Sequence, residues 1–169
     1  ANLHDSFETV YIRPPQALVE FGLVKAGTIW RCFKAMYGLR ISPKAWGLER
    51  DKELKKMTVN LHGKKYYFKQ SVIDPSVWTI LDSGFVPEGA GSGSQVRTDA
   101  AAIGFLVTYV DDFLILGSDE LIDAVTNVIR AQWKLTEKPS VSIGSGRSVE
   151  YLGVMITAYP NGDYLDQTV

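Results

Sequence analysis

The chain has 169 residues, of which 46% are hydrophobic and 22% are charged, and its formal net charge is −1. This composition is typical of a globular domain with one adequate core, and it excludes a disordered chain. The single cysteine, Cys32, cannot form an internal disulfide, no segment resembles a signal peptide, and the apolar runs are too short to cross a membrane. We therefore expect a protein that is not secreted and has no membrane partner.

The small net charge conceals an asymmetry between the two halves of the chain. Residues 1–69 hold 13 Lys and Arg against 6 Asp and Glu, whereas residues 70–169 hold 5 against 13. A basic half beside an acidic half suits a protein that grips a polyanionic backbone and concentrates metal ions at one point. The plainer alternative is that many of the lysines are solvated on a helix.

The first third of the chain predicts two strands and a helix. A strand from Val10 is ended by Pro14 and Pro15, and residues 28–33 alternate as a second strand before a turn at Gly38. Ser42 and Pro43 then predict a helix start, with Ser42 as the cap. This helix has an apolar side and a basic side. The apolar side consists of Ala45, Trp46, Leu54 and Met57. The basic side consists of Lys44, Arg50, Lys52, Lys55 and Lys56.

The next segment predicts a hairpin, a turn and a long insertion. Residues 64–69 combine three lysines with three aromatic residues, which is typical of a protected edge strand. Asp74-Pro75-Ser76 predicts a turn before a strand at residues 77–81. The Gly- and Ser-rich residues 82–98 predict a flexible surface insertion.

Two adjacent carboxylates, Asp111 and Asp112, lie between two apolar runs, residues 103–109 and 113–116. Both runs predict short strands buried on two faces, joined as a hairpin with the two aspartates at its bend. Carboxylates about 5 Å apart repel by roughly 3 kcal/mol at an effective dielectric near 20, and bound Mg²⁺ or Mn²⁺ reverses this cost. The alternative is a surface turn that happens to be acidic.

The last third predicts a second helix and a C-terminal hairpin. Ser118 caps a helix whose buried stripe is Leu121, Val125, Val128, Ile129 and Trp133, and which ends near Leu135. A strand follows at residues 149–156, then a turn at residues 160–162 and a last strand. The fold class is α+β, and we expect an antiparallel sheet with both helices on one face and the carboxylates exposed at one edge.

The Tyr109-Val110-Asp111-Asp112 segment resembles the Tyr-x-Asp-Asp hairpin of reverse transcriptases. Further segments are similar to the polymerase region of copia-type retrotransposon polyproteins and occur in that family's order: Val10 to Pro14, Trp30 to Trp46, Asp74-Pro75-Ser76, residues 109–118 and Tyr151-Leu152-Gly153-Val154. The resemblance covers about the whole chain. It implies a polymerase palm with partial fingers: residues 1–45 as partial fingers and nucleotide-pocket segment, 46–156 as palm around the insertion at 82–98, and 157–169 as the truncated start of the following region.

The resemblance also implies the reaction, which is templated DNA synthesis by two-metal phosphoryl transfer with Mg²⁺ or Mn²⁺. One ion would activate the primer 3′-hydroxyl and the other would hold the incoming triphosphate. Asp111 matches the principal metal-binding, catalytic carboxylate, and Asp112 the adjacent acid. The other implied roles are the primer terminus (Tyr109, Val110), the nucleotide pocket (Tyr37, Gly38, Arg40), nucleic-acid binding (Arg31, Lys44) and the primer grip (Tyr151, Leu152, Gly153).

The chain departs from the family pattern at several positions. The family's first catalytic aspartate lies in an Asp-Val-x-x-Ala-Phe-Leu stretch, which this chain enters only at Ala1. Asn2 stands where an aromatic, nucleotide-selecting residue is usual, and Ile41 replaces a usual Gln. Without that aspartate and a thumb, we expect the chain to be inactive by itself.

The implied partners are an RNA or DNA primer-template, deoxynucleoside triphosphates and the remainder of the polyprotein. The implied location is the cytoplasm, in the virus-like particle of the parent element, or the nucleus. Two other readings stay open. One is a non-catalytic nucleic-acid-binding α+β module from a decayed element, and the other is a plain α+β interaction domain that binds no nucleic acid.

Overall fold

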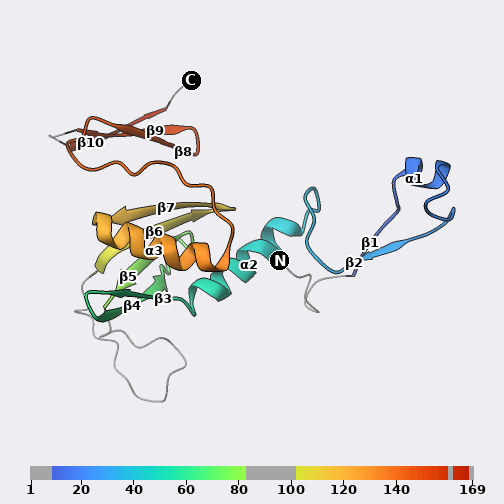
Figure 1. Ribbon diagram of the computed structural model, residues 1–169, viewed down its shortest axis with the longest axis horizontal. Coiled ribbons are helices and arrows are strands. Elements are labelled where there is room, and N and C mark those ends of the chain that lie inside the picture. The colour runs from blue at the N-terminus through green and yellow to red at the C-terminus, as the bar shows by residue number, and fades with distance from the viewer. Residues whose placement is uncertain (1–8, 83–101, 160–161, 168–169) are drawn as a thin grey trace, which may run out of the picture. The chain divides into compact units, whose positions relative to one another are not determined.

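The computed structural model describes residues 9–82, 102–159 and 162–167 (Figure 1). Its helices and strands confirm the α+β class with antiparallel sheets. In chain order they are β1 (Val10–Ile12), α1 (Gln16–Glu20), β2 (Trp30–Cys32), α2 (Ser42–Leu54), β3 (Thr58–Leu61), β4 (Lys64–Gln70), β5 (Val77–Leu81), β6 (Ala102–Tyr109), β7 (Asp112–Gly117), α3 (Asp119–Gln132), β8 (Ser148–Tyr151), β9 (Val154–Tyr159) and β10 (Gly162–Gln167).

The chain divides into two compact units, residues 1–56 and 57–169. In the first unit, β1 pairs with β2 as an antiparallel ribbon. Helix α1 was not predicted from the sequence. It begins one residue after Pro15, because proline removes a strand hydrogen bond but is compatible with the start of a helix.

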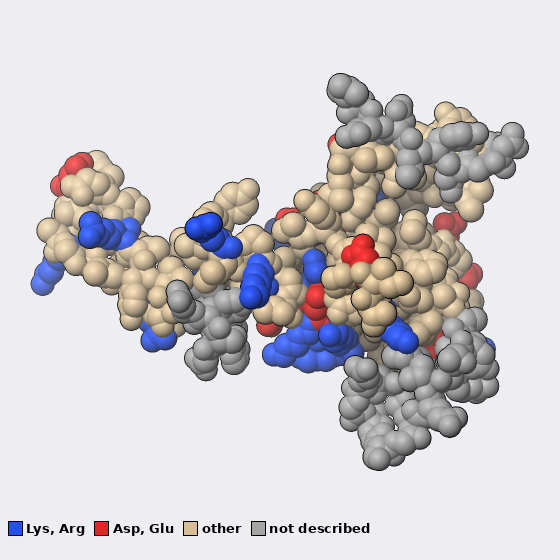
Figure 2. All heavy atoms as spheres, turned by 180° about the vertical axis from the view of Figure 1, so that it is seen from behind, with Lys and Arg blue, Asp and Glu red and all other residues tan. Residues whose placement is uncertain are grey.

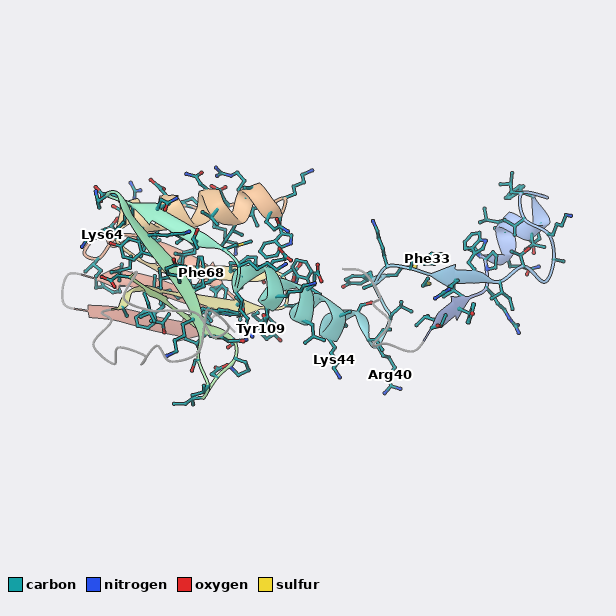
Figure 3. All side chains as sticks on the ribbon, turned by 90° about the horizontal axis from the view of Figure 1, so that it is seen from below. Phe33, Arg40, Lys44, Lys64, Phe68 and Tyr109 are labelled. Carbon is teal, nitrogen blue, oxygen red and sulfur yellow. The ribbon has the colours of Figure 1, made fainter. Side chains whose placement is uncertain are left out.

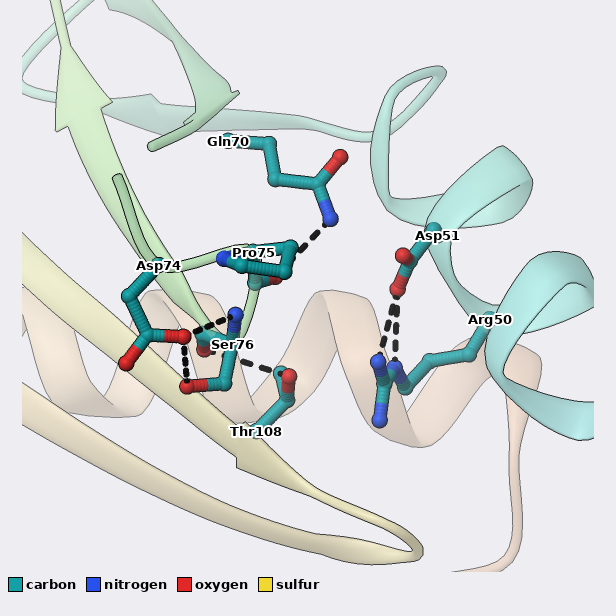
Figure 4. Close-up of polar contacts among 7 residues, drawn as sticks. All are labelled: Arg50, Asp51, Gln70, Asp74, Pro75, Ser76 and Thr108. Carbon is teal, nitrogen blue, oxygen red and sulfur yellow. Dashed lines mark hydrogen bonds and ion pairs between the residues drawn. The ribbon is translucent and has the colours of Figure 1, made fainter. Parts of the chain in front are cut away.

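Helix α2 begins at Ser42, as predicted, but Ser42 is not its cap. The Ser42 hydroxyl instead donates a hydrogen bond to the backbone oxygen of Met36 at 2.6 Å, and Ile41 occupies the cap position. Arg50 was predicted for the basic side, and this was wrong: Arg50 is buried, and its guanidinium pairs with Asp51 at 2.8 Å (Figure 4). A buried guanidinium requires such a partner, and hydrophobic spacing alone does not reveal it.

The second unit contains a five-stranded antiparallel sheet in the order β3-β4-β5-β6-β7, with α3 packed against β3 and β7. Leu121, Val125 and Ile129 of α3 are buried, which confirms three residues of the predicted stripe, whereas Val128 and Trp133 are only half-buried. The helix ends at Gln132, before Leu135, because Trp133 is extended. The other buried apolar side chains of this unit's sheet are Val59, Tyr66, Phe68, Trp78, Ile80, Leu81 and Leu106.

The expectation that the two strands of the acidic hairpin are buried on both faces was wrong. In β6, Gly104, Leu106 and Thr108 are buried, whereas Phe105 and Tyr109 are exposed. One face of the hairpin therefore lies in the core and the other carries apolar side chains at the surface.

A three-stranded antiparallel sheet, in the order β10-β9-β8, completes the second unit. The single strand predicted for residues 149–156 was wrong, because the chain reverses between Tyr151 and Val154. The insertion predicted for residues 82–98 lies, apart from Asp82, outside the described residues, and so does Asn2. No helix within the described part of the chain is long and apolar enough to cross a membrane.

Candidate active site

The acidic hairpin is a two-residue turn between β6 and β7. Tyr109 pairs with Asp112, so Val110 and Asp111 form the turn and Asp112 is the first residue of β7. The predicted bend is thus displaced by one residue. Asp111 and Asp112 are both exposed, and β7 is the edge strand of its sheet, which confirms the expected position of the carboxylates.

The side of the sheet on which Asp112 lies follows from its neighbour. The ring of Phe113 stacks on Trp133, directly after α3, with ring centroids 5.8 Å apart. Since successive side chains of a strand point to opposite faces, Asp112 and its partner Tyr109 lie on the face that α3 does not cover. Both residues are exposed, so the hairpin presents the Asp112 carboxylate and the Tyr109 phenol on the same face; Tyr109 is labelled in Figure 3.

The turn is conformationally strained at Val110. Its φ is +48°, in the left-handed region that branched side chains rarely adopt. Such turns usually carry Gly or Asn at this position, because those residues tolerate a positive φ. A residue held in such a conformation costs about 1–3 kcal/mol of strain. Strained residues of this kind are often found at functional sites, where the surrounding structure holds them in place.

A second turn supports the hairpin from the adjacent strand. The backbone N–H of Thr108 donates to the Ser76 oxygen at 2.8 Å, and the Thr108 hydroxyl donates to the same oxygen at 3.2 Å (Figure 4). Thr108 is only 2% exposed, so these bonds are shielded from water. The Asp74-Pro75-Ser76 turn thus holds the strand residue next to Tyr109.

The Asp74 side chain in turn stabilises the turn that contains Ser76. One carboxylate oxygen of Asp74 accepts hydrogen bonds from the Ser76 hydroxyl at 2.6 Å and from the Ser76 backbone N–H at 2.9 Å. These two bonds favour the ionised form and lower the pKa of Asp74 from its ordinary value of 3.8. The sequence predicted this turn but not its hydrogen bond with Thr108. The signal that could have indicated the bond is the Thr108 hydroxyl, which lies inside an apolar run and therefore needs a partner.

The base of the hairpin is fixed by two glycines that face each other, Gly104 in β6 and Gly117 in β7. A Cβ atom on Gly104 would lie 2.5 Å from the Leu121 Cδ2 and 2.5 Å from the backbone oxygen of Leu116. A Cβ on Gly117 would lie 2.7 Å from the same Leu121 atom. The absence of two side chains therefore lets the first turn of α3 approach the sheet closely.

The Asp111 and Asp112 carboxylates have the hard oxygen atoms that a divalent cation prefers. Mg²⁺ binds hard oxygen ligands and commonly uses one or two carboxylates together with waters and substrate phosphates. Within the described ranges, no group of three or more His, Cys, Asp and Glu residues could hold a metal ion by itself. The donor set thus suits an ion that a phosphate ligand helps to hold, and Asp111 and Asp112 are the residues that would bind it.

The predicted nucleotide-pocket residues belong to the first unit and form a turn followed by a helix start. The N–H of Leu39 bonds to the Met36 oxygen at 3.3 Å, and Gly38 has a φ of +88° within this turn. Tyr37 at the turn is fully exposed. Arg40 and Lys44 extend from the chain in the same direction in Figure 3, so this segment presents two cations and an aromatic ring.

The predicted primer-grip residues form the hairpin between β8 and β9. Tyr151 pairs with Val154, and Leu152 and Gly153 form the turn with φ of +54° and +76°. A positive φ at both central residues is typical of a type I′ turn, the common two-residue hairpin turn in which Gly is favoured. Leu152 is exposed at the tip.

The structure thus brings Tyr109, Val110, Asp111 and Asp112 together in one hairpin, and Tyr151, Leu152 and Gly153 together in another. Arg31, Tyr37, Gly38, Arg40 and Lys44 lie in the first unit. No protein-family model, curated protein or solved structure matches this chain. The candidate site is therefore defined by its geometry and by the order of the sequence motifs.

Proposed function

We propose that this chain is the palm, with part of the fingers, of the RNA-directed DNA polymerase of a copia-type retrotransposon. The main support is the exposed Asp111-Asp112 pair, which lies at the tip of an antiparallel hairpin on a sheet whose other face packs against α3. An acidic turn of this kind, inside a series of motifs in the family's order, suits templated nucleotide addition.

Asp111 and Asp112 are the proposed catalytic and metal-binding residues. A bound Mg²⁺, or Mn²⁺, would neutralise phosphate charge and lower the pKa of the attacking hydroxyl. Asp111, at the tip of the turn, is the principal ligand, and Asp112 supplies the adjacent carboxylate. Tyr109 lies across the strand pair from Asp112 and contacts the primer terminus together with Val110.

The remaining residues bind the nucleic acid and the nucleotide. Arg40 contacts the triphosphate, and Gly38 allows the backbone to approach it closely beside Tyr37. Arg31 and Lys44 contact the primer-template, and the Tyr151-Leu152-Gly153 turn positions the primer. The partners are a primer-template, deoxynucleoside triphosphates and the rest of the polyprotein, within the cytoplasm or nucleus of the host cell.

The test measures Mg²⁺-dependent binding of a fluorescent deoxynucleoside triphosphate to the 169-residue chain. Asp111→Asn should weaken this binding at least about tenfold, because a neutral amide is a poorer ligand for a hard cation. Asp123→Asn is the matched control, since Asp123 is an exposed acid on α3. Equal binding by the wild-type and Asp111→Asn proteins would refute the metal role.

Primer extension tests the activity itself. The 169-residue chain should not extend a primer, because two-metal transfer needs carboxylates from both sides of the site, and the part of the chain that the structure describes has no group of three or more His, Cys, Asp and Glu residues that could hold a metal ion. A longer chain that includes the family's first catalytic aspartate and its thumb should extend the primer, and Asp111→Asn should abolish the extension. Extension by the 169 residues alone would contradict this expectation.

The second candidate function is a non-catalytic nucleic-acid-binding module. It is favoured by the excess of basic residues in the first 69 positions, which needs no metal to act on phosphates. Nucleic-acid binding that is unaffected by Asp111→Asn, without Mg²⁺-dependent triphosphate binding, would support this candidate in place of the polymerase.

A further inference from the structure

The open face of the five-stranded sheet is the face that α3 does not cover. At the base of the acidic hairpin, Gly104 and Gly117 lie against the Leu121 side chain of α3, which fixes the covered face. Side chains alternate along a strand, and residues that pair across two strands share a face. The open face of β6 and β7 therefore carries four apolar side chains that we call the apolar stripe, namely Phe105, Val107, Leu114 and Leu116.

The apolar stripe is accessible at the surface. Phe105 is 43% exposed and Leu116 is 46% exposed, and these two residues pair directly across β6 and β7. Val107 and Leu114, the next pair toward the acidic turn on this face, are half-buried. Figure 1 shows α3 in front of this sheet, and Figure 2, seen from behind, shows that much of the visible surface of the second unit is uncharged. A contiguous apolar patch of this kind indicates a contact with another molecule.

Two lysine side chains border the apolar stripe on one side. Lys69 pairs with Thr79, and Thr79 pairs with Phe105, so one row across the sheet leads from Lys69 to the stripe. Lys65 lies four residues before Lys69 in β4 and therefore on the same face. Within the five strands as the structure describes them, the acidic side chain on the open face is Asp112, at the end next to the turn. The border along β4 is therefore basic.

The apolar stripe has the width of one helix. A helix with its side chains is about 10 Å across and neighbouring strands lie about 4.8 Å apart, so one helix covers about two strands. A helix that lies along β6 and β7 turns one flank toward β4, where Lys65 and Lys69 are about 13 Å apart along the strand. Acidic side chains about eight residues apart match this separation, because a helix rises about 1.5 Å per residue.

We propose that the open face binds an amphipathic helix of a partner protein, whose apolar ridge packs on the stripe and whose acidic flank pairs with Lys65 and Lys69. Helices of this kind bind apolar surfaces through side chains that recur every three or four residues. The proposal does not depend on the polymerase function, because this contact needs neither a metal ion nor a nucleic acid.

Two other occupants complement the open face less well. A second copy of this chain would bring the same two lysines to the contact, and like charges repel. A polyanion finds no partner at the centre of the face, because none of the four side chains of the stripe can donate a hydrogen bond to a phosphate. An acidic amphipathic helix offers both the apolar ridge and the opposite charge.

The test is fluorescence anisotropy of the 169-residue chain with labelled model peptides, in EDTA and without nucleic acid. Each peptide is a helix of about 18 residues with one leucine ridge. The Glu peptide carries glutamates about eight residues apart on one flank, and the Lys peptide carries lysines at those positions. A scrambled peptide has the composition of the Glu peptide without its ridge. The Glu peptide should bind best, and the other two should bind at least about tenfold more weakly.

Charge reversal on β4 tests the predicted orientation. The double variant Lys65→Glu, Lys69→Glu should bind the Lys peptide more tightly than the Glu peptide, because the border is then acidic. Lys64→Glu is the matched control, since Lys64 is an exposed lysine of the same strand whose side chain points to the opposite face. This control should keep the preference for the Glu peptide. The same preference in the double variant would overturn the proposal.

Shortening the apolar stripe tests the packing contact. Leu116→Gln should weaken binding of the Glu peptide about fivefold or more, whereas Leu48→Gln, at an exposed leucine of α2, should bind like the wild-type protein. Circular dichroism verifies that the variants are folded, which is expected since the altered side chains are exposed. Self-association of the chain that Leu116→Gln abolishes would assign the face to a second copy. Oligonucleotide binding that Leu116→Gln weakens as much as peptide binding would assign it to nucleic acid, and either result would overturn the proposal.

Discussion

Thr108 and Ser76 are joined by two hydrogen bonds to one acceptor. The Thr108 backbone N–H and hydroxyl both donate to the Ser76 oxygen, at 2.8 and 3.2 Å. These residues lie 32 positions apart, and Thr108 immediately precedes Tyr109. The Asp74-Pro75-Ser76 turn therefore supports the acidic hairpin through Thr108, the residue before Tyr109.

The Thr108 hydroxyl should stabilise the fold measurably. Thr108→Val keeps the side-chain shape but removes one donor to Ser76, so we expect the free energy of unfolding to fall by about 0.5–1.5 kcal/mol. Urea unfolding measures this change. Thr79→Val on β5 is the control, because no hydroxyl contact is found for Thr79 among the described residues. Equal effects of the two substitutions would contradict the role of the Ser76 bond.

Val110 should be a strained position that glycine relieves. Glycine adopts a positive φ without steric cost, and the strain removed, about 1–3 kcal/mol, exceeds the entropy cost of glycine, about 0.5–1 kcal/mol. Val110→Gly should therefore leave the free energy of unfolding unchanged or raise it. Val72→Gly, at an exposed valine without a positive φ, should lower it. Thermal unfolding of both variants decides the question, and destabilisation by Val110→Gly would refute the strain.

Substitution by alanine should destabilise the fold more at Gly104 than at Gly117, the two glycines at the base of the hairpin. In Gly104→Ala the new methyl would meet the Leu116 backbone oxygen as well as Leu121, and the backbone cannot move aside easily. We expect a loss of about 1–3 kcal/mol, as in other overpacked cores. Gly117→Ala should cost less, because its closest neighbour is the flexible Leu121 side chain.

Combining each alanine with Leu121→Ala provides the internal control. The smaller side chain should remove the clash of Gly117→Ala but leave the clash of Gly104→Ala with the Leu116 oxygen. Double-mutant cycles from chemical unfolding measure this difference. Equal rescue of both glycine variants would show that the backbone contact is unimportant.

Asp74 should make the stability dependent on pH on the acid side. Its pKa is lowered by the hydrogen bonds from Ser76, so the folded state holds the ionised carboxylate more strongly than the unfolded state does. The resulting stabilisation is present above the ordinary pKa of 3.8 and is lost as the pH falls through the lower folded pKa. Asp74→Asn should flatten the dependence of stability on pH below that value.

Ser76→Ala separates the hydrogen bond from the charge in this experiment. It removes the hydroxyl donor, so NMR titration should show the Asp74 pKa returning toward its ordinary value. Ser148→Ala is the control, because the Ser148 hydroxyl bonds to Thr157 and not to Asp74, and it should leave the lowered pKa of Asp74 unchanged. An unchanged Asp74 pKa in Ser76→Ala would contradict the assigned cause.

The local elements of this protein follow from the sequence itself. Ser118 caps α3 by accepting a hydrogen bond from the Leu121 N–H at 3.3 Å, as its place before acidic residues predicts. The Asp74 turn and the hairpin around Asp111 were also predicted, because capping, turn preference and strand periodicity depend on residues only a few positions apart.

Only the tertiary structure decided which partners these elements meet. Ser42 has the sequence context of a helix cap, but its hydroxyl bonds to the Met36 oxygen, since a backbone acceptor six residues earlier is within reach. An apolar run likewise does not reveal that one face of β6 is open, because burial depends on which helix covers the sheet. The Thr108–Ser76 bonds and the packing of Leu121 on two glycines arise from contacts between separate strands and a helix, and local periodicity carries no information about such contacts.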